Sequence, residues 1–432
     1  MVNQLSRKIK DSGIKWIGAI PEDWEVRKVK DIFLRKKSEA KQEDPIILSL
    51  ARDGIKIRDI SNNEGQLATS YYNYNPVEAG DFLINPMDLY SGANCNVSLV
   101  EGVISPAYVN LRANNGNVAR FFDYYFKTQY WAMALFAHGK GVSYENRWTL
   151  NNEALMNYFM PVPNIQEQQK IAIFLDQNIS DIDHILEKTR ESIEEYKKYK
   201  QSIITEAVTK GLNPNVEMKD SGIEWIGEIP KHWEVTKLKK IIESPLQYGA
   251  NSSGVNYDEN LPRYIRITDI TTDNKLKEDG KLSLPIQEAE QFILKNNDIL
   301  FARSGGTVGK TFIYKDIYGL SAFAGYLIKA EISKSIKEEF IYYYTLSSAY
   351  NEWKNRIFIQ STIQNIGADK YSNMEIVMPT EKKEQDQIVN YLDYKCTEID
   401  SLISQKESLL KNLELYKKSL IYESVTGKRE VM

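Results

Sequence analysis

The fold is decided by residues 163–211, which read PNIQEQQKIAIFLDQNISDIDHILEKTRESIEEYKKYKQSIITEAVTKG. Asn164, followed three residues later by Glu167, is typical of a capped helix start. The apolar residues that follow recur every three or four positions, which predicts one amphipathic helix: Ile171, Leu175, Ile179, Ile182, Leu186, Ile193, Tyr196 and Ile203. Gly211 ends it, and Pro214 lies just beyond. Without internal glycine or proline the helix would be about 65 Å long, and its narrow apolar stripe requires a partner helix.

A second copy of this helix stands at the C-terminal end of the chain. From Glu384 onward, its apolar residues are Ile388, Leu392, Cys396, Ile399, Leu402, Leu409, Leu413, Tyr416 and Leu420. They match the first helix at a constant offset of 217 residues, as 388 − 171, 392 − 175 and 416 − 199 show. Residues 176–183 (DQNISDID) correspond in the same way to residues 393–400 (DYKCTEID). One register kept over this length indicates an internal duplication rather than two unrelated surface helices.

A shorter lead segment is duplicated as well. Residues 11–26 read DSGIKWIGAIPEDWEV, and residues 220–235 read DSGIEWIGEIPKHWEV. The chain is therefore built as lead, body and helix, twice in succession. We expect the lead tryptophans to be packing anchors, although exposed tryptophans also stack on nucleic-acid bases: Trp16, Trp24, Trp225 and Trp233.

The two bodies share far less sequence, and each mixes short strand-like runs with turns and a helix. The first body has strand-like runs at 45–50, 81–84 and 107–111 and a helix near 118–136. The second has strand-like runs at 264–267, 298–301 and 311–314 and a helix near 334–356. The leads and helices, which together form the frame, have stayed alike while the bodies have diverged. This pattern indicates one repeated function for the frame and two different functions for the bodies.

These elements predict an α+β protein in which two pseudo-twofold-related α/β domains are joined by a pair of long antiparallel coiled-coil helices. The expected divisions are 1–163 and 213–380 for the two domains with their leads, and 164–212 and 381–432 for the helices. Such a spacer is long enough to hold two major-groove readers one turn of DNA apart, about 34 Å.

Length and composition limit the classes of protein to which this chain can belong. A chain of 432 residues exceeds what one core usually organises, so at least two domains are expected. No apolar run approaches the ~18 residues of a membrane span, and residues 1–10 lack the hydrophobic stretch of a secretory signal. We therefore expect a cytoplasmic protein. Cys95 and Cys396 fit a reducing compartment, and with only three histidines besides we expect no metal site.

The formal net charge of −4 argues against a surface that binds nucleic acid everywhere, but it leaves room for local basic faces. Residues 27–41 carry seven positive charges against only Asp31 and Glu39. The long helices carry much of the acid instead. This basic segment is either a nucleic-acid-binding face or an ordinary solvated surface.

Two stretches resemble catalytic motifs, and both are incomplete. Residues 304–311 (SGGTVGKT) nearly spell a phosphate-binding loop, but a serine takes its first glycine position and strand-like rather than helical residues follow. The same glycine-rich turn, with Arg303, Thr307 and Lys310, better suits contact with a DNA backbone or base edge. Residues 85–88 (NPMD) match only half of the motif with which amino-methyltransferases hold a target base. We therefore expect a non-enzyme.

The duplicated order and its motifs resemble the specificity subunit of type I restriction-modification systems. The resemblance is carried by the two WIGxIPxxW leads and by the Glu-Gln-x-x-Ile helix starts at 167–171 and 384–388. Body elements at 80–84 (GDFLI) and 298–305 (DILFARSG) add to it. It covers essentially the whole chain, and its specificity comes from order and duplication together.

This resemblance implies that each body is a target recognition domain that reads one half of a bipartite, asymmetric site in double-stranded DNA. The helices would be the spacer between the half-sites and the docking surface for two methyltransferase subunits, which the endonuclease-translocase subunit would join. Adenine methylation with S-adenosylmethionine and ATP-driven cleavage would belong to those partners, so this chain would hold no cofactor. The alternative is an adaptor that presents two interaction domains on a coiled coil and binds no DNA.

Candidate DNA-contacting residues are those in the bodies with amides, hydroxyls or cationic groups, which read base edges or bind phosphates. In the first body they are Lys28, Lys30, Arg52, Lys56, Arg58, Tyr90, Ser91 and Asn94. In the second body they are Gln247, Tyr248, Asn251, Arg263, Arg266, Arg303, Ser304, Thr307, Lys310, Gln360, Ser361 and Thr362. The first body has PMDLYSG at 86–92 in place of the Arg-Ser-Gly form, so we expect no equivalent guanidinium contact there.

Overall fold

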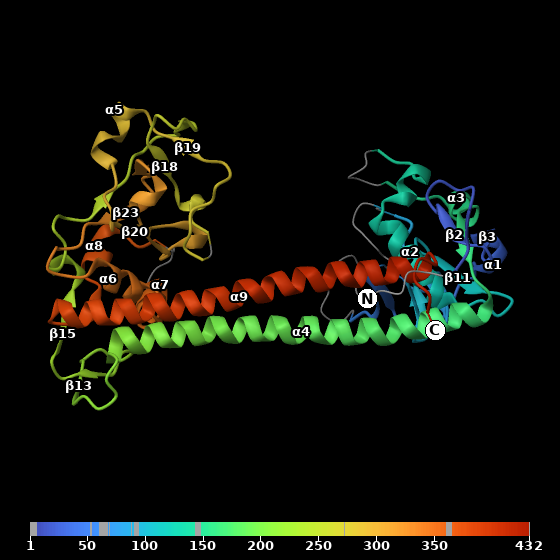
Figure 1. The fold of residues 1–432 in the computed structure, drawn as a ribbon, viewed down its shortest axis with the longest axis horizontal. Coiled ribbons are helices and arrows are strands. Elements are labelled where there is room, and N and C mark those ends of the chain that lie inside the picture. Colours follow the sequence, from blue (N-terminus) through green and yellow to red (C-terminus); the bar gives the residue numbers. More distant parts are fainter. Residues whose placement is uncertain are drawn as a thin grey trace. The chain divides into compact units, whose positions relative to one another are not determined.

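The structure is a computed structural model that describes residues 7–51, 54–59, 68, 70–87, 89, 95–142, 148–271, 273–359 and 365–431. The chain divides into two compact units (Figure 1). Unit 1 is made of Met1–Arg190 with Ser408–Met432, and unit 2 is made of Glu191–Glu407. Both divisions fall inside long helices, so each unit contains part of helix α4 (Ile165–Lys210) and part of helix α9 (Lys382–Val425).

The two long helices begin and end close to where their sequence predicts. The Glu167 amide donates a hydrogen bond of 3.0 Å to the side-chain oxygen of Asn164, which caps the start of α4. Gly211 follows the last residue of α4 with a φ of 75°, the left-handed conformation that commonly ends a helix. The prediction of two long helices is therefore confirmed.

In unit 1, the first part of α4 pairs with the last part of α9. Lys417 Nζ lies 2.6 Å from Asp183 Oδ1, and Arg190 Nη2 lies 2.9 Å from Glu414 Oε1. Because the partner's number falls from 417 to 414 as the α4 number rises from 183 to 190, the two helices run in opposite directions. This confirms the antiparallel pairing for unit 1.

Unit 2 repeats the same contact with the two copies exchanged. Lys200 Nζ lies 2.7 Å from Asp400 Oδ2, and these residues stand at the 217-residue offset from Lys417 and Asp183 (417 − 200 and 400 − 183). Gly211 at the end of α4 lies beside the Glu384 side chain near the start of α9, so the helices are antiparallel here too. The duplicated sequence thus forms one ion pair twice, once in each unit.

Reversing one of these ion pairs tests the register of the helices. We expect Asp183→Lys to lower the free energy of unfolding by less than about 1 kcal/mol, because the pair is partly solvated. Adding Lys417→Asp should restore the loss, whereas adding Lys411→Asp should not. The measurement is denaturant unfolding followed by helical circular dichroism; equal rescue by both second changes would contradict the register.

The body of unit 1 is built around a four-stranded antiparallel sheet in the order β4-β11-β8-β9, against which helix α2 packs. These elements are β4 (Phe33–Lys36), β8 (Phe82–Ile84), β9 (Cys95–Val97), β11 (Val109–Ala113) and α2 (Ala119–Trp131). The other elements are β1 (Ile9–Asp11), β2 (Ala19–Pro21), β3 (Glu25–Lys28), α1 (Val29–Ile32), β5 (Leu48–Ala51), β6 (Gly54–Ile57), β7 (Asn75–Val77), β10 (Gly102–Ile104), η1 (Ala134–His138), α3 (Asn152–Met156) and β12 (Phe159–Val162). The three strand-like runs predicted in this body overlap β5, β8 and β11.

The body of unit 2 contains two four-stranded sheets, in the orders β16-β23-β20-β21 and β17-β19-β18-β22. Their strands are β16 (Gln247–Tyr248), β17 (Val255–Asn256), β18 (Arg263–Ile265), β19 (Leu282–Ser283), β20 (Ile299–Ala302), β21 (Thr311–Ile313), β22 (Ser321–Phe323) and β23 (Leu327–Ala330). The other elements are β13 (Met218–Asp220), β14 (Glu228–Pro230), β15 (Trp233–Lys237), η2 (Leu238–Lys240), η3 (Ile267–Asp269), α5 (Ile286–Ala289), η4 (Glu290–Phe292), η5 (Gly305–Thr307), η6 (Asp316–Tyr318), α6 (Glu338–Thr345), α7 (Ser348–Ile359), α8 (Ala368–Ser372) and β24 (Glu375–Pro379). The predicted runs here overlap β18, β20 and β21.

The single helix predicted near 334–356 is wrong in one respect, because two helices, α6 and α7, stand there. Side chains of α4 bind the break between them. Gln201 Nε2 donates to the Leu346 carbonyl at 2.5 Å, and the Ser348 amide donates to Thr205 Oγ1 at 2.9 Å. The end of α6 and the start of α7 are thus capped by a segment more than 140 residues away in sequence.

The lead tryptophans are packing anchors, as predicted. Trp24 and Trp233 are fully buried, and their indole nitrogens each donate a 3.0 Å hydrogen bond to a glutamate near the start of a long helix, Glu167 and Glu384 respectively. Trp16 is partly buried and stacks on the ring of Tyr158, with centroids 5.3 Å apart. Each lead is therefore fastened to the helix start of its own unit.

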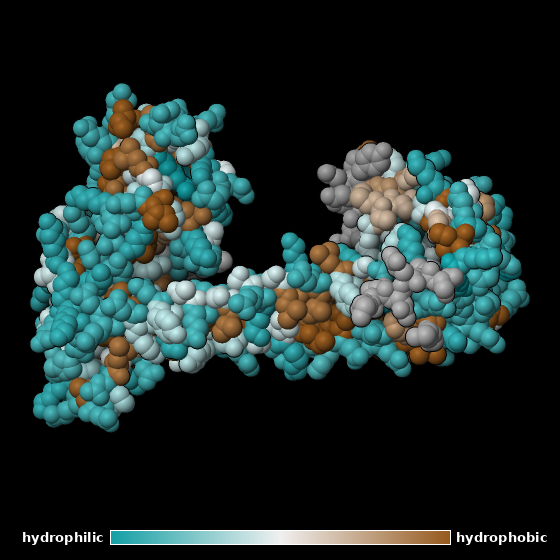
Figure 2. All heavy atoms as spheres, in the orientation of Figure 1, coloured by the Kyte–Doolittle hydropathy of each residue, from teal (hydrophilic) through white to brown (hydrophobic). Residues whose placement is uncertain are grey.

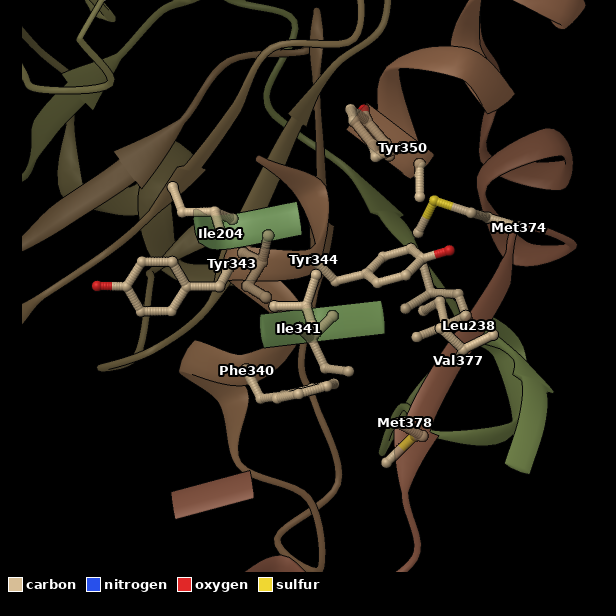
Figure 3. Close-up of a cluster of buried hydrophobic side chains, with 14 of the residues drawn as sticks. Ile204, Leu238, Phe340, Ile341, Tyr343, Tyr344, Tyr350, Met374, Val377 and Met378 are labelled. Atoms are coloured by element: carbon tan, nitrogen blue, oxygen red, sulfur yellow. The ribbon is translucent and has the colours of Figure 1, made fainter. Parts of the chain in front are cut away.

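The core of unit 2 joins its body to the long helices. Figure 3 shows Phe340, Ile341 and Tyr344 of α6 among Ile204 of α4 and Val377 of β24, and all of these side chains are buried. The surface around both cores is mostly polar, with smaller apolar patches on the bodies and along the helices (Figure 2). The body and the helix of this unit are therefore one packed structure.

Candidate nucleic-acid interface

The glycine-rich turn of unit 2 lies in a β-hairpin. Strands β20 and β21 pair antiparallel, and the turn is closed by hydrogen bonds from the Gly309 amide to the Ala302 carbonyl (2.9 Å) and from the Ala302 amide to the Lys310 carbonyl (2.8 Å). A strand rather than a helix follows the turn, as predicted, so the turn does not lead into a helix N-terminus as a phosphate-binding loop does. The turn is therefore a hairpin loop that presents Ser304 and Thr307 at its partly exposed surface.

One end of the sheet β16-β23-β20-β21 holds three residues with large side chains. Tyr248 is the last residue of β16, Arg303 follows β20, and Tyr326 precedes β23. The guanidinium carbon of Arg303 lies 4.9 Å from the centre of the Tyr248 ring, and the Arg303 amide donates to the Tyr326 carbonyl at 3.0 Å. We call these three residues the Arg303 cluster.

The Arg303 cluster provides aromatic rings and a guanidinium group, which bind nucleic-acid bases and their edges. Tyr248 and Tyr326 are 40% and 63% exposed, which is high for tyrosines held at the end of a sheet. The hydroxyl of Tyr248 accepts a 3.0 Å hydrogen bond from the Ala368 amide, which fixes the ring under the guanidinium group. A cation held on an aromatic face keeps its planar donors ordered, ready for a guanine edge or a phosphate.

Sequence reasoning selects Arg303 and Tyr248 but misses Tyr326. The signal was available, because Gly325-Tyr326 is a turn that precedes an apolar strand. The proximity of Tyr326 to Arg303 depends on the pairing of β23 with β20, which the sequence does not reveal.

Other predicted residues of unit 2 are engaged by internal partners. Arg263 is buried, donates to the Lys277 carbonyl and lies 3.5 Å from Glu278. Arg266 lies 2.8 Å from Asp269, which raises the pKa of the guanidinium group. Because these groups are already bound, we leave both arginines out of the interface proposed below.

The remaining amides of unit 2 lie close to the same sheet end. Gln247 is on β16 next to Tyr248 and donates to the Gln291 carbonyl at 2.8 Å. The Asn251 side chain contacts Gly325, beside Tyr326. Gln360, Ser361 and Thr362 lie outside the described residues.

The predicted residues of unit 1 lie on separate elements. Lys28 Nζ is 5.1 Å from the ring centre of Phe159, and Lys30 Nζ donates to Asn157 Oδ1 at 3.0 Å. Lys56 is on β6, and Arg58 follows that strand. The other four lie outside the described part of the chain: Arg52, Tyr90, Ser91 and Asn94.

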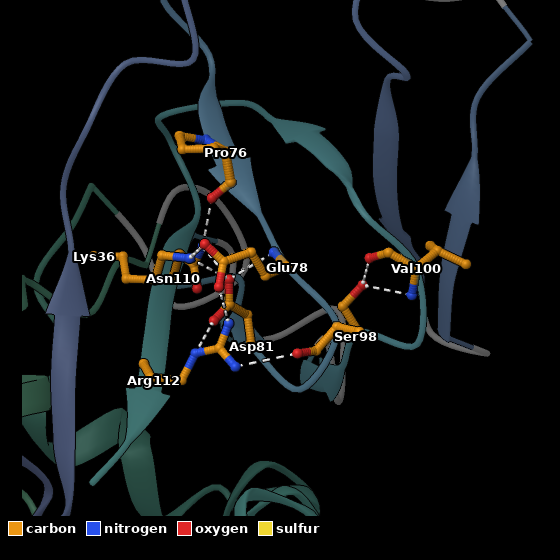
Figure 4. A network of polar contacts seen from close by, with 9 residues as sticks. Lys36, Pro76, Glu78, Asp81, Ser98, Val100, Asn110 and Arg112 are labelled. Atoms are coloured by element: carbon orange, nitrogen blue, oxygen red, sulfur yellow. Dashed lines mark hydrogen bonds and ion pairs between the residues drawn. The ribbon is translucent and has the colours of Figure 1, made fainter.

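Part of the basic segment at 27–41 is neutralised inside unit 1. Lys36 Nζ lies 2.9 Å from Asp81 Oδ2, and Arg112 Nε lies 2.7 Å from Asp81 Oδ1 (Figure 4). Asp81 is fully buried, so this network serves the interior of the body. Lys36 is therefore a structural cation, whereas the described contacts of Lys28 and Lys30 are with the Phe159 ring and the Asn157 side chain.

Among the described residues, no group of three or more histidine, cysteine, aspartate or glutamate side chains is placed to hold a metal ion. None of the helices described combines the length and the apolar character that a membrane crossing requires.

Comparison with known proteins points to one family. A family model described as "Type I restriction modification DNA specificity domain" matches residues 21–195 and 230–412. Its two matches each contain one body and part of the following long helix, which agrees with the duplication.

Relatives match over nearly the whole length. The type I restriction enzyme MjaVIII specificity subunit of Methanocaldococcus jannaschii is 25% identical over 439 residues, 95% of this chain and 94% of the relative. The type I restriction enzyme EcoBI specificity subunit of Escherichia coli is 23% identical over 450 residues, 98% of this chain and 90% of the relative.

Solved structures share the fold. One is a chain from a study of complex assembly and conformational transition of the type I R-M system, with a TM-score of 0.72, 16% identity and coverage of 96% of this chain and 99% of that one. Another is the HsdS subunit from Thermoanaerobacter tengcongensis, with a TM-score of 0.53, 14% identity and coverage of 96% and 99%. With its two matched domains, its duplicated leads and its paired long helices, this chain belongs to the type I restriction-modification DNA specificity family.

Proposed function

We propose that this chain is the DNA-specificity subunit of a type I restriction-modification complex and that each body reads one half of a bipartite, asymmetric site in double-stranded DNA. The observation that carries this proposal is a repeated frame with unlike bodies. The Trp–Glu and Asp–Lys contacts of the frame recur in both units. The bodies differ: where the sequence of unit 2 has Arg303, the matching place in unit 1 has NPMD and the residues after it. Two unlike readers on one frame select an asymmetric sequence.

We propose a division of labour along the chain that follows this duplication. Residues 1–163 and 213–380 are the two target recognition domains with their leads, and residues 164–212 and 381–432 are the helices that act as spacer. The chain contributes no catalytic group or cofactor of its own. Methylation and cleavage belong to partner subunits that act on cytoplasmic DNA.

The helices are the docking surface for two methyltransferase subunits in this proposal. Tyr199 of α4 and Tyr416 of α9 occupy equivalent positions (416 − 199 = 217) and are 56% and 49% exposed. Exposed aromatic side chains are frequent at the centres of protein interfaces. The same exposed tyrosine on each copy suits two copies of one partner, and the endonuclease-translocase subunit would then join that assembly.

Selection from a random pool of duplexes tests the proposal. The chain, purified together with its methyltransferase, should enrich one asymmetric sequence made of two specified parts around an unspecified gap. Binding should weaken steeply with salt, because phosphate contacts release counterions. Enrichment of no sequence, together with unchanged partner binding after removal of both helices, would favour an adaptor without DNA.

Arg303 gives a residue-level prediction. We expect Arg303→Ala to lower the affinity for the selected duplex by about 5- to 160-fold, because a bidentate guanidinium contact to a base edge contributes about 1–3 kcal/mol. Arg303→Lys should recover only part of it, since a lysine cannot make the forked contact.

The matched control is Arg356→Ala. Its guanidinium group also lies on an aromatic ring, that of Trp225 at 4.6 Å, but it pairs with Glu224 of the lead. Electrophoretic mobility shift at fixed salt gives the affinities. Equal losses of affinity for the duplex in Arg303→Ala and Arg356→Ala would show that Arg303 is not part of the interface.

A further inference from the structure

We propose that two buried tyrosines of unit 2, Tyr350 and Tyr371, are positioning residues that hold Arg303 where it reads a base pair. This inference rests on the proposed DNA-binding function and adds two residues whose side chains do not reach the surface. Tyr350 lies on α7 and Tyr371 on α8, and both are fully buried. Neither belongs to a motif of the sequence, so their role follows from what their hydroxyl groups bind.

The two hydroxyl groups hold the two strand ends of the glycine-rich hairpin. Tyr371 donates to the Ala302 carbonyl at 2.9 Å, and Tyr350 donates to the Gly309 carbonyl at 2.8 Å. Ala302 and Gly309 face each other across the hairpin, because the Gly309 amide donates to the same Ala302 carbonyl at 2.9 Å. Arg303 is the first residue beyond this pair. The base of the loop that carries it is therefore fixed on both strands.

A short segment, residues 366–371, reaches both the backbone and the side-chain support of Arg303. The Ile366 amide donates to the Arg303 carbonyl at 2.9 Å. The Ala368 amide donates to the hydroxyl of Tyr248, whose ring lies against the guanidinium group. The last residue of the segment supplies the hydroxyl that holds the strand end before Arg303. A shift of this segment would therefore move the guanidinium group.

Both tyrosine hydroxyls are protonated donors at neutral pH. Burial raises the pKa of Tyr350 and of Tyr371, because a phenolate would lose its hydration inside the core. Trp353 stacks on Tyr350 with centroids 5.5 Å apart and lies 5.6 Å from the Tyr371 ring. Since packing also holds the rings, removal of one hydroxyl should leave its ring in place.

The direction of the Arg303 side chain depends on this support. Within the described residues, its buried Nε has no hydrogen-bond partner, whereas Arg263 and Arg266 are ion-paired inside unit 2. The guanidinium group is therefore oriented by the backbone of Arg303 and by the Tyr248 ring. A guanine edge accepts two hydrogen bonds from one arginine, and both require the fork to point in the right direction.

The equivalent position in unit 1 has no hydroxyl group. Asn157 and Asn373 follow α3 and α8, and each side chain donates to the carbonyl four residues earlier, which sets an offset of 216 (373 − 157). This offset makes Leu155, a buried core residue, the counterpart of Tyr371 (371 − 216). The sequence of unit 1 also has PMDLYSG at 86–92 in place of the Arg-Ser-Gly form. The tyrosine and the arginine thus occur together in one body, and neither has a like counterpart in the other.

The test is Tyr371→Phe in the complete assembly with the methyltransferase. Affinity is measured for the selected duplex and for duplexes in which each specified base pair is changed in turn, and the ratio of the two is the discrimination at that base pair. Arg303→Ala identifies the base pair that Arg303 reads. Tyr371→Phe should lower the discrimination at that base pair by about 2- to 10-fold, the range for one buried hydrogen bond, and leave the other base pairs unchanged. Tyr350→Phe should act in the same way, which guards against a fold defect in either single variant.

Tyr344→Phe is the matched control. The Tyr344 side chain is also buried in unit 2, and its hydroxyl donates to a backbone carbonyl, that of Glu375, at 3.0 Å. This variant should lose as much stability in denaturant unfolding as Tyr371→Phe and keep the wild-type discrimination at every base pair. A loss of stability alone therefore does not explain the result expected for Tyr371→Phe.

A double variant shows whether the effect passes through the arginine. In the Arg303→Ala background, Tyr371→Phe should cause no further loss of discrimination at the base pair in question. The inference is overturned if both tyrosine variants discriminate like Tyr344→Phe, if they weaken discrimination at all base pairs alike, or if Arg303→Ala lowers discrimination at none. Failure of the wild-type assembly to select any duplex would instead refute the proposed function itself.

Discussion

Replacement of Asp81 by alanine is expected to lower the free energy of unfolding of unit 1 by about 3–5 kcal/mol, the usual cost of breaking a buried ion pair from one side. The Asp81 carboxylate is completely buried and is shared by Lys36 and Arg112 at 2.9 and 2.7 Å. It also accepts hydrogen bonds from the Glu78 amide and the Asn110 side chain (Figure 4). Without it, Lys36 and Arg112 keep only the exposed carboxylate of Glu78 as an ionic partner, and the Glu78 amide and the Asn110 side chain lose an acceptor inside the body.

Glu78 provides the matched control, because it contacts the same two cations from the surface. Its carboxylate lies 3.0 Å from Lys36 Nζ and 2.6 Å from Arg112 Nη2, and it is 63% exposed. Glu78→Ala should therefore cost less than about 1 kcal/mol. Native-state hydrogen exchange of the β8 and β11 amides measures both variants. Similar losses of protection in Asp81→Ala and Glu78→Ala would show that burial of the carboxylate does not determine how much the network stabilises unit 1.

Trp233→Ala should destabilise unit 2 by about 3–5 kcal/mol, the range for removing a large aromatic side chain from a core. The Trp233 ring packs edge-on against Phe340 with centroids 6.2 Å apart and covers Gly211 at the end of α4. Its indole nitrogen binds Glu384 at 3.0 Å, so the carboxylate would also lose a donor. The start of α9 and the second lead should lose hydrogen-exchange protection together.

Two controls accompany this variant. Trp225→Ala should cost less, because Trp225 is only partly buried. Trp24→Ala should reproduce the loss in unit 1 and leave the amides of unit 2 protected, since Trp24 binds Glu167 in the equivalent way. If Trp233→Ala unprotected the amides of unit 1 as strongly as those of unit 2, the two anchors would not be independent.

The frame can be predicted from the sequence because its information is local and repeated. The spacing of apolar residues, the cap at Asn164 and the stop at Gly211 specify α4 without reference to any other segment. The constant offset of 217 residues then predicts α9. That the two helices pair follows because a narrow apolar stripe must be covered, while the ion pairs show that they run antiparallel.

The candidate interface is only partly predictable, because it depends on contacts between distant segments. Tyr326 joins Arg303 through strand pairing, and Tyr350 ties α7 to the hairpin by its hydrogen bond to the Gly309 carbonyl. The break between α6 and α7 is capped by Gln201 and so has no local signal. Residue type alone likewise cannot show that Arg263 is buried beneath the Lys277 carbonyl.

Mapping of methylated adenines in the genome of cells that express this chain with its methyltransferase is the most direct test that two unlike bodies on a duplicated frame select DNA. We expect methylation at one asymmetric motif, made of two specified parts at a constant separation, and none when the chain is omitted. Methylation at a single uninterrupted motif, or the same pattern with and without the chain, would contradict this function.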